Sequence, residues 1–394
     1  MRISYLLVLI VIIVSGNPAV FVINKNLVYI LTFIVLAIYA VKHPKPIIKY
    51  DFLFVMFFVF LFVIQNIFYG QIVLMASLGF LIKIGIAALA VRIIPGFFHK
   101  FVLIMVFLAG LSLIFYIPTL LGIDLRGILS VMKIPLSSDI VHIGLHNFHV
   151  ANDTRNSGIF WEPGAFAGYL VLALFLASIL ERGVQKSWHA KLLIAALIST
   201  QSTTGFIAGF IVLVLYFYEK TKYSFKLPTP ILFSFILLFS VTLGWFLSNN
   251  ISFIGTKIDV HLSKTIAQEG NYKINRFGNI NYDLGFIAER PIIGWGANPA
   301  TRFTMDPELA ELMSGQGVGL TGSIIKFGIP GFLLYIFYFY RGCISITGSK
   351  SYAIGGGCML CILLIGEQFL NYPLFFTLVF LNFYPRSFFT AAPR

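Results

Sequence analysis

The chain alternates membrane-length apolar runs with short basic loops, and two long polar segments interrupt this alternation. The first polar island covers residues 123–158 and the second covers residues 248–320. Hydrophobic residues make up 58% of the 394 positions and charged residues 11%, against roughly 25% charged in a soluble domain. This composition excludes a soluble globular fold and predicts a polytopic helical membrane protein.

We predict an all-α fold with about 12 transmembrane helices, in one membrane domain that comprises residues 1–394. Both islands are then loops, at residues 123–158 and 249–319, and the second loop precedes the last three spans. The predicted spans are 3–22, 26–41, 51–69, 71–93, 101–122, 161–181, 189–202, 203–218, 230–248, 320–340, 352–370 and 372–390.

The positions of the basic residues predict the orientation of these spans. The net charge is +13, and most Lys and Arg residues fall in the short loops on the side of the N-terminus. Short cytoplasmic loops collect positive charge, whereas long loops are exempt from this rule. We therefore expect a multi-pass protein of the bacterial inner membrane with both termini cytoplasmic and both islands periplasmic. The positive charge is explained by topology, so no nucleic acid is expected as a partner.

Several sequence motifs are missing, and their absence argues against several kinds of binding site and reaction. Neither island contains a cysteine, a P-loop or an Asp-x-Asp pair, so we expect no disulfide, no nucleotide-driven pump, no metal-bridged sugar transfer and no cofactor. His142, His146 and His149 are spaced as on one helix face. Zinc binding, saccharide binding by His146 and ordinary loop positions all remain open for them.

Two basic residues fall inside predicted spans, where a cation is costly and is a functional candidate by default. Lys83 lies near mid-span and could face an internal cavity. Lys326 lies within two turns of the outer end of its span and could extend to the interface instead. For Glu367, close to the outer end of its own span, an ordinary interfacial position is expected.

Residues 192–219 are too long for one span and too short for two ordinary ones, although positive charge flanks both ends. The chain must therefore turn near residues 199–205. Polar backbone at this depth is tolerated only beside protein or a water-filled cavity. We expect a wet cavity lined by the Ser/Thr/Gln patch that includes Gln201 and Thr203, with packing between helices by small residues as the alternative.

The first island ends in Arg155-Asn-Ser-Gly-Ile-Phe-Trp-Glu-Pro163 and runs directly into an apolar segment. Proline is favoured in the first turn of a helix, so a helix is predicted to start near Pro163. Arg155 could bind a phosphate with two parallel hydrogen bonds. Glu162 could accept a proton or bind a sugar hydroxyl, or it could simply cap the helix.

Within the second island, apolar residues at positions 274, 277, 280, 284 and 287 predict an amphipathic helix near 274–290. Such a helix could lie in the membrane interface and hold Arg276 over the mouth of the cavity. Together with Arg155, Arg290 and Arg302, Arg276 could neutralise a diphosphate leaving group without a metal. Trp161 and Tyr272 could stack on sugar rings, although aromatic residues are common at interfaces.

These segments, together with Glu289-Arg-Pro-Ile-Ile-Gly294-Trp-Gly296 and Gly319-Leu-Thr-Gly-Ser-Ile-Ile-Lys-Phe-Gly328-Ile-Pro-Gly331, resemble the O-antigen polymerase and ligase superfamily. The polysaccharide polymerase branch is the most similar. In the ligase branch a His-Asn pair commonly opens the segment in which Gly317-Val318 stands here, and an arginine often takes the place of Thr203.

The resemblance implies a metal-independent glycosyltransferase that moves a growing glycan from undecaprenyl diphosphate to an incoming lipid-linked repeat unit. It implies that Arg276 and Arg155 hold the diphosphate and that Glu162 lies in the catalytic cavity. Implied partners are the lipid-linked oligosaccharide, membrane lipid, a chain-length regulator and a flippase. His146 and His261 remain alternatives to Glu162 as the base, and a ligase or an oligosaccharide flippase remains an alternative function.

Overall fold

The computed structural model describes residues 2–20, 24–43, 49–123, 125, 129, 134–137, 140–142, 144–149, 154–180, 187–221, 276–302 and 318–383. The structure is mostly helical, as the sequence predicts. Within this described part of the chain, seven helices are long and apolar enough to cross a membrane, and four further apolar helices are shorter. The predicted span 230–248 lies outside the described residues, and the count of twelve crossings stays a prediction.

A helix overlaps every other predicted span, and in the last one, 372–390, a short α-helix is followed by a 3-10 helix that ends at residue 383. The α-helices in these spans are α1 (Arg2–Gly16), α3 (Lys25–Lys42), α4 (Lys49–Tyr69), α5 (Leu74–Ile93), α6 (Phe97–Leu120), α8 (Pro163–Leu180), α9 (Ser187–Ser199), α10 (Thr203–Thr221), α15 (Gly319–Thr347), α16 (Lys350–Gly366) and α17 (Pro373–Phe376). A helix in the second island, α13, spans Arg276–Glu289. The 3-10 helices are η1 (Gly70–Val73), η3 (Pro299–Thr301), η4 (Phe369–Asn371) and η5 (Thr377–Phe383).

The first island adds a small sheet that the all-α prediction did not include. Strands β1 (Ile134–Ser137), β2 (Ile140–His142) and β3 (Asn147–His149) form an antiparallel sheet in the order β1-β2-β3. The register pairs Ile134 with His142 and Val141 with Phe148. Short apolar runs with Ile, Val and Phe between polar residues favour strands, and here this signal competes with the helical spacing of His142, His146 and His149.

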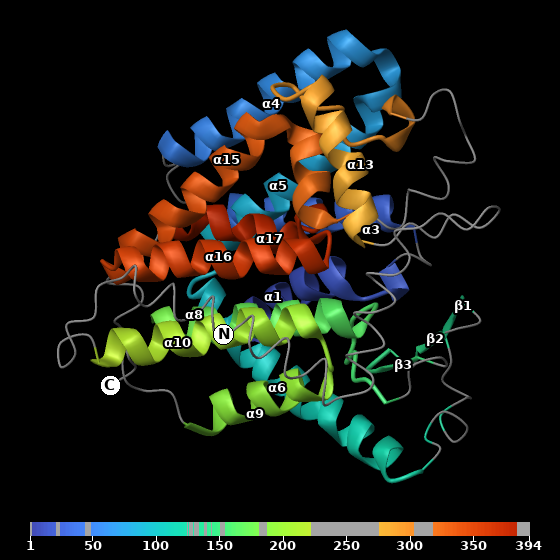
Figure 1. Ribbon diagram of the computed structural model, residues 1–394, viewed down its shortest axis with the longest axis vertical. Coiled ribbons are helices and arrows are strands. Elements are labelled where there is room, and N and C mark those ends of the chain that lie inside the picture. Colours follow the sequence, from blue (N-terminus) through green and yellow to red (C-terminus); the bar gives the residue numbers. More distant parts are fainter. Residues whose placement is uncertain are drawn as a thin grey trace.

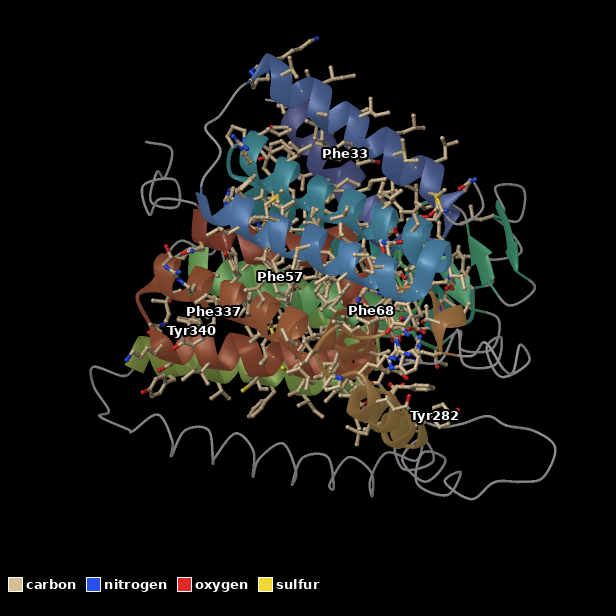
Figure 2. The ribbon with its side chains drawn as sticks, turned by 90° about the horizontal axis from the view of Figure 1, so that it is seen from above. Phe33, Phe57, Phe68, Tyr282, Phe337 and Tyr340 are labelled. Atoms are coloured by element: carbon tan, nitrogen blue, oxygen red, sulfur yellow. The ribbon has the colours of Figure 1, made fainter. Side chains whose placement is uncertain are left out.

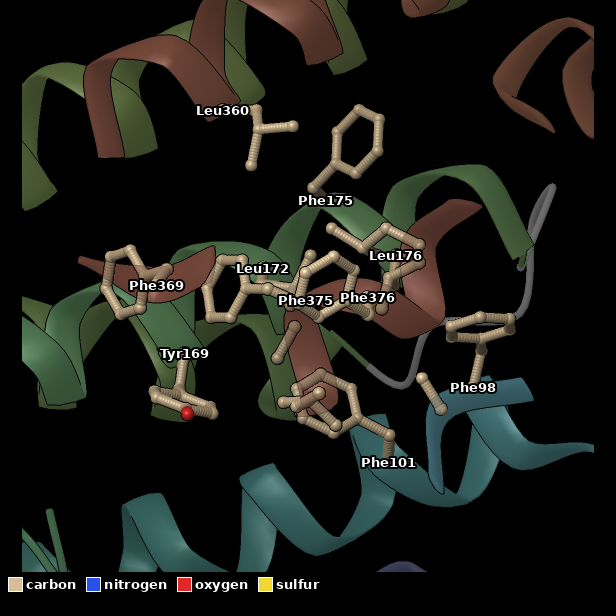
Figure 3. Close-up of a cluster of buried hydrophobic side chains, with 14 of the residues drawn as sticks. Phe98, Phe101, Tyr169, Leu172, Phe175, Leu176, Leu360, Phe369, Phe375 and Phe376 are labelled. Carbon is tan, nitrogen blue, oxygen red and sulfur yellow. The ribbon is translucent and has the colours of Figure 1, made fainter. Parts of the chain in front are cut away.

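Helix α8 is the centre of the bundle. Of the membrane-length window in this helix, 89% is buried, the highest share among the seven candidate spans. Figure 3 shows its side chains Tyr169, Leu172 and Phe175 in one apolar cluster with rings from neighbouring helices. The Phe369 and Phe375 rings stack at 4.2 Å within that cluster, so the link between α16 and α17 is fixed against α8.

The outer surface of the bundle is apolar over much of its length. Large hydrophobic side chains point outward from several helices (Figure 2), and Ile67 and Met75 are 76% and 77% exposed. Other outward-facing examples are Phe60, Phe68, Phe107, Ile114 and Phe337. A surface of this kind fits a hydrocarbon environment, because a water-exposed patch of this extent would be strongly unfavourable.

Helix α15 is broken at Gly328, within the motif that carries the family resemblance. Gly328 has φ 68° and ψ 170°, a conformation open essentially to glycine alone. The break leaves main-chain groups without helical partners, and the loop after α13 supplies new ones. Trp295 N–H donates to Ile325 O at 2.6 Å, and Ile329 N–H donates to Pro291 O at 2.8 Å. The second island is therefore joined to the bundle through backbone hydrogen bonds.

Gln65 of α4 also contacts this junction between α15 and the loop after α13. We expect its replacement to destabilise the junction. Its Nε2 donates to Ile293 O at 2.6 Å and to Lys326 O at 2.8 Å. We expect Gln65→Leu to lower the free energy of unfolding by about 2–6 kcal/mol, because it leaves two buried acceptors unsatisfied and each costs about 1–3 kcal/mol. Thermal unfolding of the purified protein measures this. Asn66→Leu is the control, since within the described residues Asn66 bonds to Phe62 O of its own helix and to no other segment. An equal loss in both variants would contradict the assignment.

Candidate functional site

The parts of the chain that the sequence marks as polar meet at one end of the bundle. Helices α6, α9 and α16 end there, and α8, α10 and α15 begin there; we call it the island end. Figure 1 shows α13 and the β-sheet at this same end of the molecule, on the right-hand side. Main-chain contact between Trp161 N–H and Gly16 O, at 3.2 Å, brings the end of α1 to the same place.

The segment 155–163 is held firmly between α6, α9 and α8. Asn156 Nδ2 donates to Ser112 Oγ at 3.0 Å and to Ser199 Oγ at 2.9 Å, and its Oδ1 accepts from Gly158 N–H. Gly158 has φ 55°, and a Cβ there would lie 3.1 Å from the Phe166 ring. Glycine is therefore required for the turn that brings the chain to the start of α8.

The turn between α9 and α10 contacts the first island. Ser199, Thr200 and Ser202 are buried, and Gln201 Nε2 donates to Thr154 O at 2.9 Å. Arg155 Nε donates to Thr200 O at 3.1 Å. The patch thus binds the first island, and these contacts give partners to the polar backbone at the turn between the two helices.

Glu162 lies directly before α8, and Glu367 directly after α16. The main-chain oxygen of Glu162 accepts the N–H of Phe166 at 3.1 Å and so starts the helix. The two carboxylates converge at Gly164: a Cβ on this residue would lie 2.8 Å from Glu367 Oε1 and 3.8 Å from Glu162 Oε1. Two carboxylates close together at a helix N-terminus can divide acid and base work between them.

An aromatic pair lies beside these carboxylates. The rings of Trp161 and Tyr372 stack with centroids 4.6 Å apart and an interplanar angle of 28°. Both residues are half-buried, and both are sequence neighbours of the site, Trp161 next to Glu162 and Tyr372 next to Asn371. Flat aromatic surfaces next to carboxylates are suited to sugar rings, which present apolar faces and hydroxyl edges.

The polar region of the island end extends towards α13 through charged and polar side chains. Lys326 Nζ donates to Asn371 Oδ1 at 2.7 Å and to Gln368 Oε1 at 3.4 Å. Asp283 of α13 is 6% exposed and accepts the hydroxyl of Thr321 at the start of α15. Arg302 and Asp283 both act electrostatically on Lys326. The second island therefore contributes a buried carboxylate to the same polar region.

Burial and neighbouring charges have opposite effects on Asp283 and Arg302. Burial raises the pKa of the Asp283 carboxyl, whereas the Thr321 hydroxyl and the cations of Arg302 and Lys326 lower it. Burial lowers the pKa of the Arg302 guanidinium, and Asp283 raises it. Each group thus stabilises the charge of the other in a place with little water.

The predicted arginine set is divided between two places. Arg155 is anchored at the α9–α10 turn, whereas Arg290 and Arg302 both lie around Phe286 and Trp295. The Arg290 guanidinium lies 4.2 Å from the Trp295 ring and 4.8 Å from the Tyr69 ring. The Arg302 guanidinium lies 5.9 Å from the Phe286 ring. Arg276 is the first residue of α13, but its side chain lies outside the described part of the structure.

Of the other residues predicted to belong to the site, two lie in the described part of the structure and two do not. His146 is 3% exposed and packs between Phe115 and Phe148, at 5.3 and 4.7 Å between ring centroids, so its ring is part of the core of the first island. Thr203 is half-buried in the first turn of α10. Tyr272 and His261 lie outside the described residues. Among the residues that are described, no group of three or more His, Cys, Asp or Glu side chains could hold a metal ion.

Sequence reasoning did not assign a role to Glu367, Gln368, Asn371 or Asp283. The signal was present in the run Glu367-Gln-Phe-Leu-Asn371-Tyr372, which places three polar residues between two apolar spans. Because span boundaries are routinely polar, such a run is distinctive only when the fold brings it against α8 and α15.

An apolar groove between α1 and α6 leads to the island end. Its volume is about 560 Å³, and it ends beside Asn17, Leu145 and Ile159, the last of which belongs to the segment 155–163. The side chains along its length come from α1 (Tyr5, Leu9, Ile13) and α6 (Leu103, Phe107, Leu111). Tyr5 and Asn17 are twelve residues apart, which corresponds to about 18 Å along a helix.

Comparison with protein-family models, with curated proteins and with solved structures finds no match. The family resemblance therefore depends on the sequence motifs alone.

Proposed function

We propose that this chain is a membrane glycosyltransferase that polymerises lipid-linked oligosaccharide repeat units. The donor is a glycan on a polyprenyl diphosphate, undecaprenyl diphosphate by the family resemblance, and the acceptor is a sugar hydroxyl of the next lipid-linked unit. The reaction takes place at the island end, and the distribution of basic residues supports a periplasmic position for this end.

The observation that carries the proposal is the meeting of Glu162 and Glu367 beside the stacked Trp161 and Tyr372. Carboxylates and aromatic faces are the groups that recognise and activate sugars. They lie at an end of a bundle whose helices are of membrane length. This combination favours a substrate with a sugar headgroup and a lipid anchor.

The proposed step forms one glycosidic bond and breaks another. An acceptor hydroxyl attacks the anomeric carbon of the donor sugar, while the bond from that carbon to the diphosphate oxygen breaks. Glu162 accepts the hydroxyl proton, and the polyprenyl diphosphate leaves with its electron pair. Charge that develops on the leaving group needs cations placed beforehand, and a site poor in water strengthens their effect.

The apolar groove between α1 and α6 supports a lipid-linked substrate. A hydrocarbon chain along this groove would end beside Ile159, close in sequence to Glu162. A ligase would use the same donor and the same step with a different acceptor, so the ligase remains the second candidate. The polymerase and the ligase can be distinguished in cells that lack the protein. Loss of a ligase leaves long glycans on the polyprenyl carrier, whereas loss of a polymerase leaves single repeat units on the surface lipid.

Arg276→Ala is expected to slow the lengthening of the surface glycan about 100-fold or more, the usual effect of removing one group that stabilises transition-state charge. Bacteria that lack this chain should carry single repeat units on their surface lipid, and wild-type protein should restore a ladder. Arg341→Ala, near the opposite end of α15, is the control and should also restore it. A normal ladder with Arg276→Ala removes this arginine from the mechanism, and long glycans stranded on the polyprenyl carrier in the deletion strain identify a ligase.

A further inference from the structure

Lys83 lies in the middle of α5 and points its ammonium group into the bundle. Its Nζ lies 4.3 Å from the centre of the Phe80 ring and 5.1 Å from that of Tyr29. In the part of the chain that the structure describes, the charged groups that act on Lys83 are Lys25 and Lys326, and both repel it. No described carboxylate is among these groups, although a buried cation normally has one.

Lys326 reaches the same interior region from α15, just before the break at Gly328. Two of its three N–H donors are used by Asn371 and Gln368. The two segments are in contact: the Phe80 ring beside Lys83 and the ring of Phe327, the residue after Lys326 in the sequence, meet edge to face at 5.2 Å. Lys83 and Lys326 thus lie on neighbouring helices around one aromatic wall.

The ammonium groups of Lys83 and Lys326 repel each other, and each has lost part of its hydration in this poorly hydrated region. Asp283 counteracts part of this charge near Lys326, but Arg302 adds to it. A group with two or more negative charges between the lysines would remove the repulsion. Phosphate and diphosphate are such groups, and lysine binds them as a compact point charge.

We infer that Lys83 and Lys326 form a binding site for a phosphate or diphosphate group between the middle of α5 and the island end of the bundle. Asn371 and Gln368 position the Lys326 ammonium, and the aromatic side chains of Tyr29 and Phe80 hold Lys83. The inference rests on the proposed function only for its biological ligand, the diphosphate of a lipid donor. The charge that the loop arginines were predicted to supply would then come partly from the helices themselves.

Direct binding to the full-length protein in detergent tests this site without any turnover. The probes are inorganic diphosphate and farnesyl diphosphate, which separate a free anion from a lipid headgroup. We expect Lys83→Met to weaken the binding of diphosphate about tenfold or more, because the variant keeps the length of the side chain and removes its charge. Lys83→Arg should retain most of the affinity.

Lys100→Met is the matched control, since Lys100 also contacts an aromatic ring, Tyr5 at 5.6 Å, but lies at the beginning of α6. This variant should bind diphosphate as the wild type does. Binding of farnesyl diphosphate alone, with the same dependence on Lys83, would assign the site to lipid headgroups. Equal affinity of Lys83→Met and wild type, or no binding of either probe, overturns the inference.

The outcomes for the site and for the activity can be separated. If glycans are polymerised while Lys83→Met binds diphosphate normally, the lysine site is wrong and the proposed function stands. If diphosphate binding depends on Lys83 but no lipid-linked sugar is extended, the anion site stands and the proposed function fails.

Discussion

Glu162→Gln is expected to reduce the rate of glycosyl transfer about 100- to 10,000-fold, the usual contribution of a positioned general base. The amide keeps the size and the hydrogen-bonding capacity of the carboxylate, so the start of α8 should be preserved. It cannot accept the proton of the acceptor hydroxyl. The rate at saturating substrate should therefore fall, while the thermal midpoint of unfolding should change little.

Two further variants provide a control and a test of the alternative base. Glu289→Gln removes an exposed carboxylate at the end of α13 and should leave the rate unchanged. Glu367→Gln tests the second carboxylate beside Gly164. If Glu367→Gln abolishes transfer and Glu162→Gln does not, the base is Glu367 and the assignment of Glu162 from the sequence is wrong.

Gly328→Ala is expected to destabilise the protein by about 2–6 kcal/mol, from backbone strain and overpacking together. A Cβ on Gly328 would lie 2.0 Å from Ile292 O and 2.7 Å from Ile292 C, which are main-chain atoms of the loop after α13. The substitution should therefore separate the second island from α15. Thermal unfolding and the protease sensitivity of the segment around Ile292 measure the two effects.

Gly322→Ala is the matched control in the same helix. A Cβ on Gly322 meets no atom within 4 Å, and alanine is the better helix former by about 1 kcal/mol. This variant should be as stable as the wild type or slightly more stable. Equal stability of Gly328→Ala and wild type would show that the break in α15 is not needed for the fold.

The apolar pattern predicts most of the helices because each segment must satisfy its own backbone within hydrocarbon. The start of α8 near Pro163 and a helix near residues 274–290 are examples of positions found from proline and from apolar spacing. The break in α15 is different. Gly328 and Pro330 lie in an apolar run that continues smoothly to Arg341, so only the contact with the loop at Pro291–Trp295 reveals the non-helical residue.

The site is predictable only in part, because its residues come from segments far apart in the chain. Glu162 and Trp161 could be found from their place before an apolar helix. Their partners Glu367 and Tyr372 lie about two hundred residues later, and nothing in the local pattern pairs them. Burial and contacts also decide what a polar residue does. His146 packs in an aromatic core, and the Ser/Thr/Gln patch forms hydrogen bonds with the first island.

The most direct test of the account uses the purified full-length protein and a synthetic polyprenyl-diphosphate-linked repeat unit, with no metal added. The account predicts a ladder of longer lipid-linked glycans and the release of one polyprenyl diphosphate for each new linkage. Glu162→Gln should give neither product. Substrate that stays a single unit with wild-type protein, or a ladder that forms equally with Glu162→Gln, would contradict the proposal that the island end is a glycosyl-transfer site.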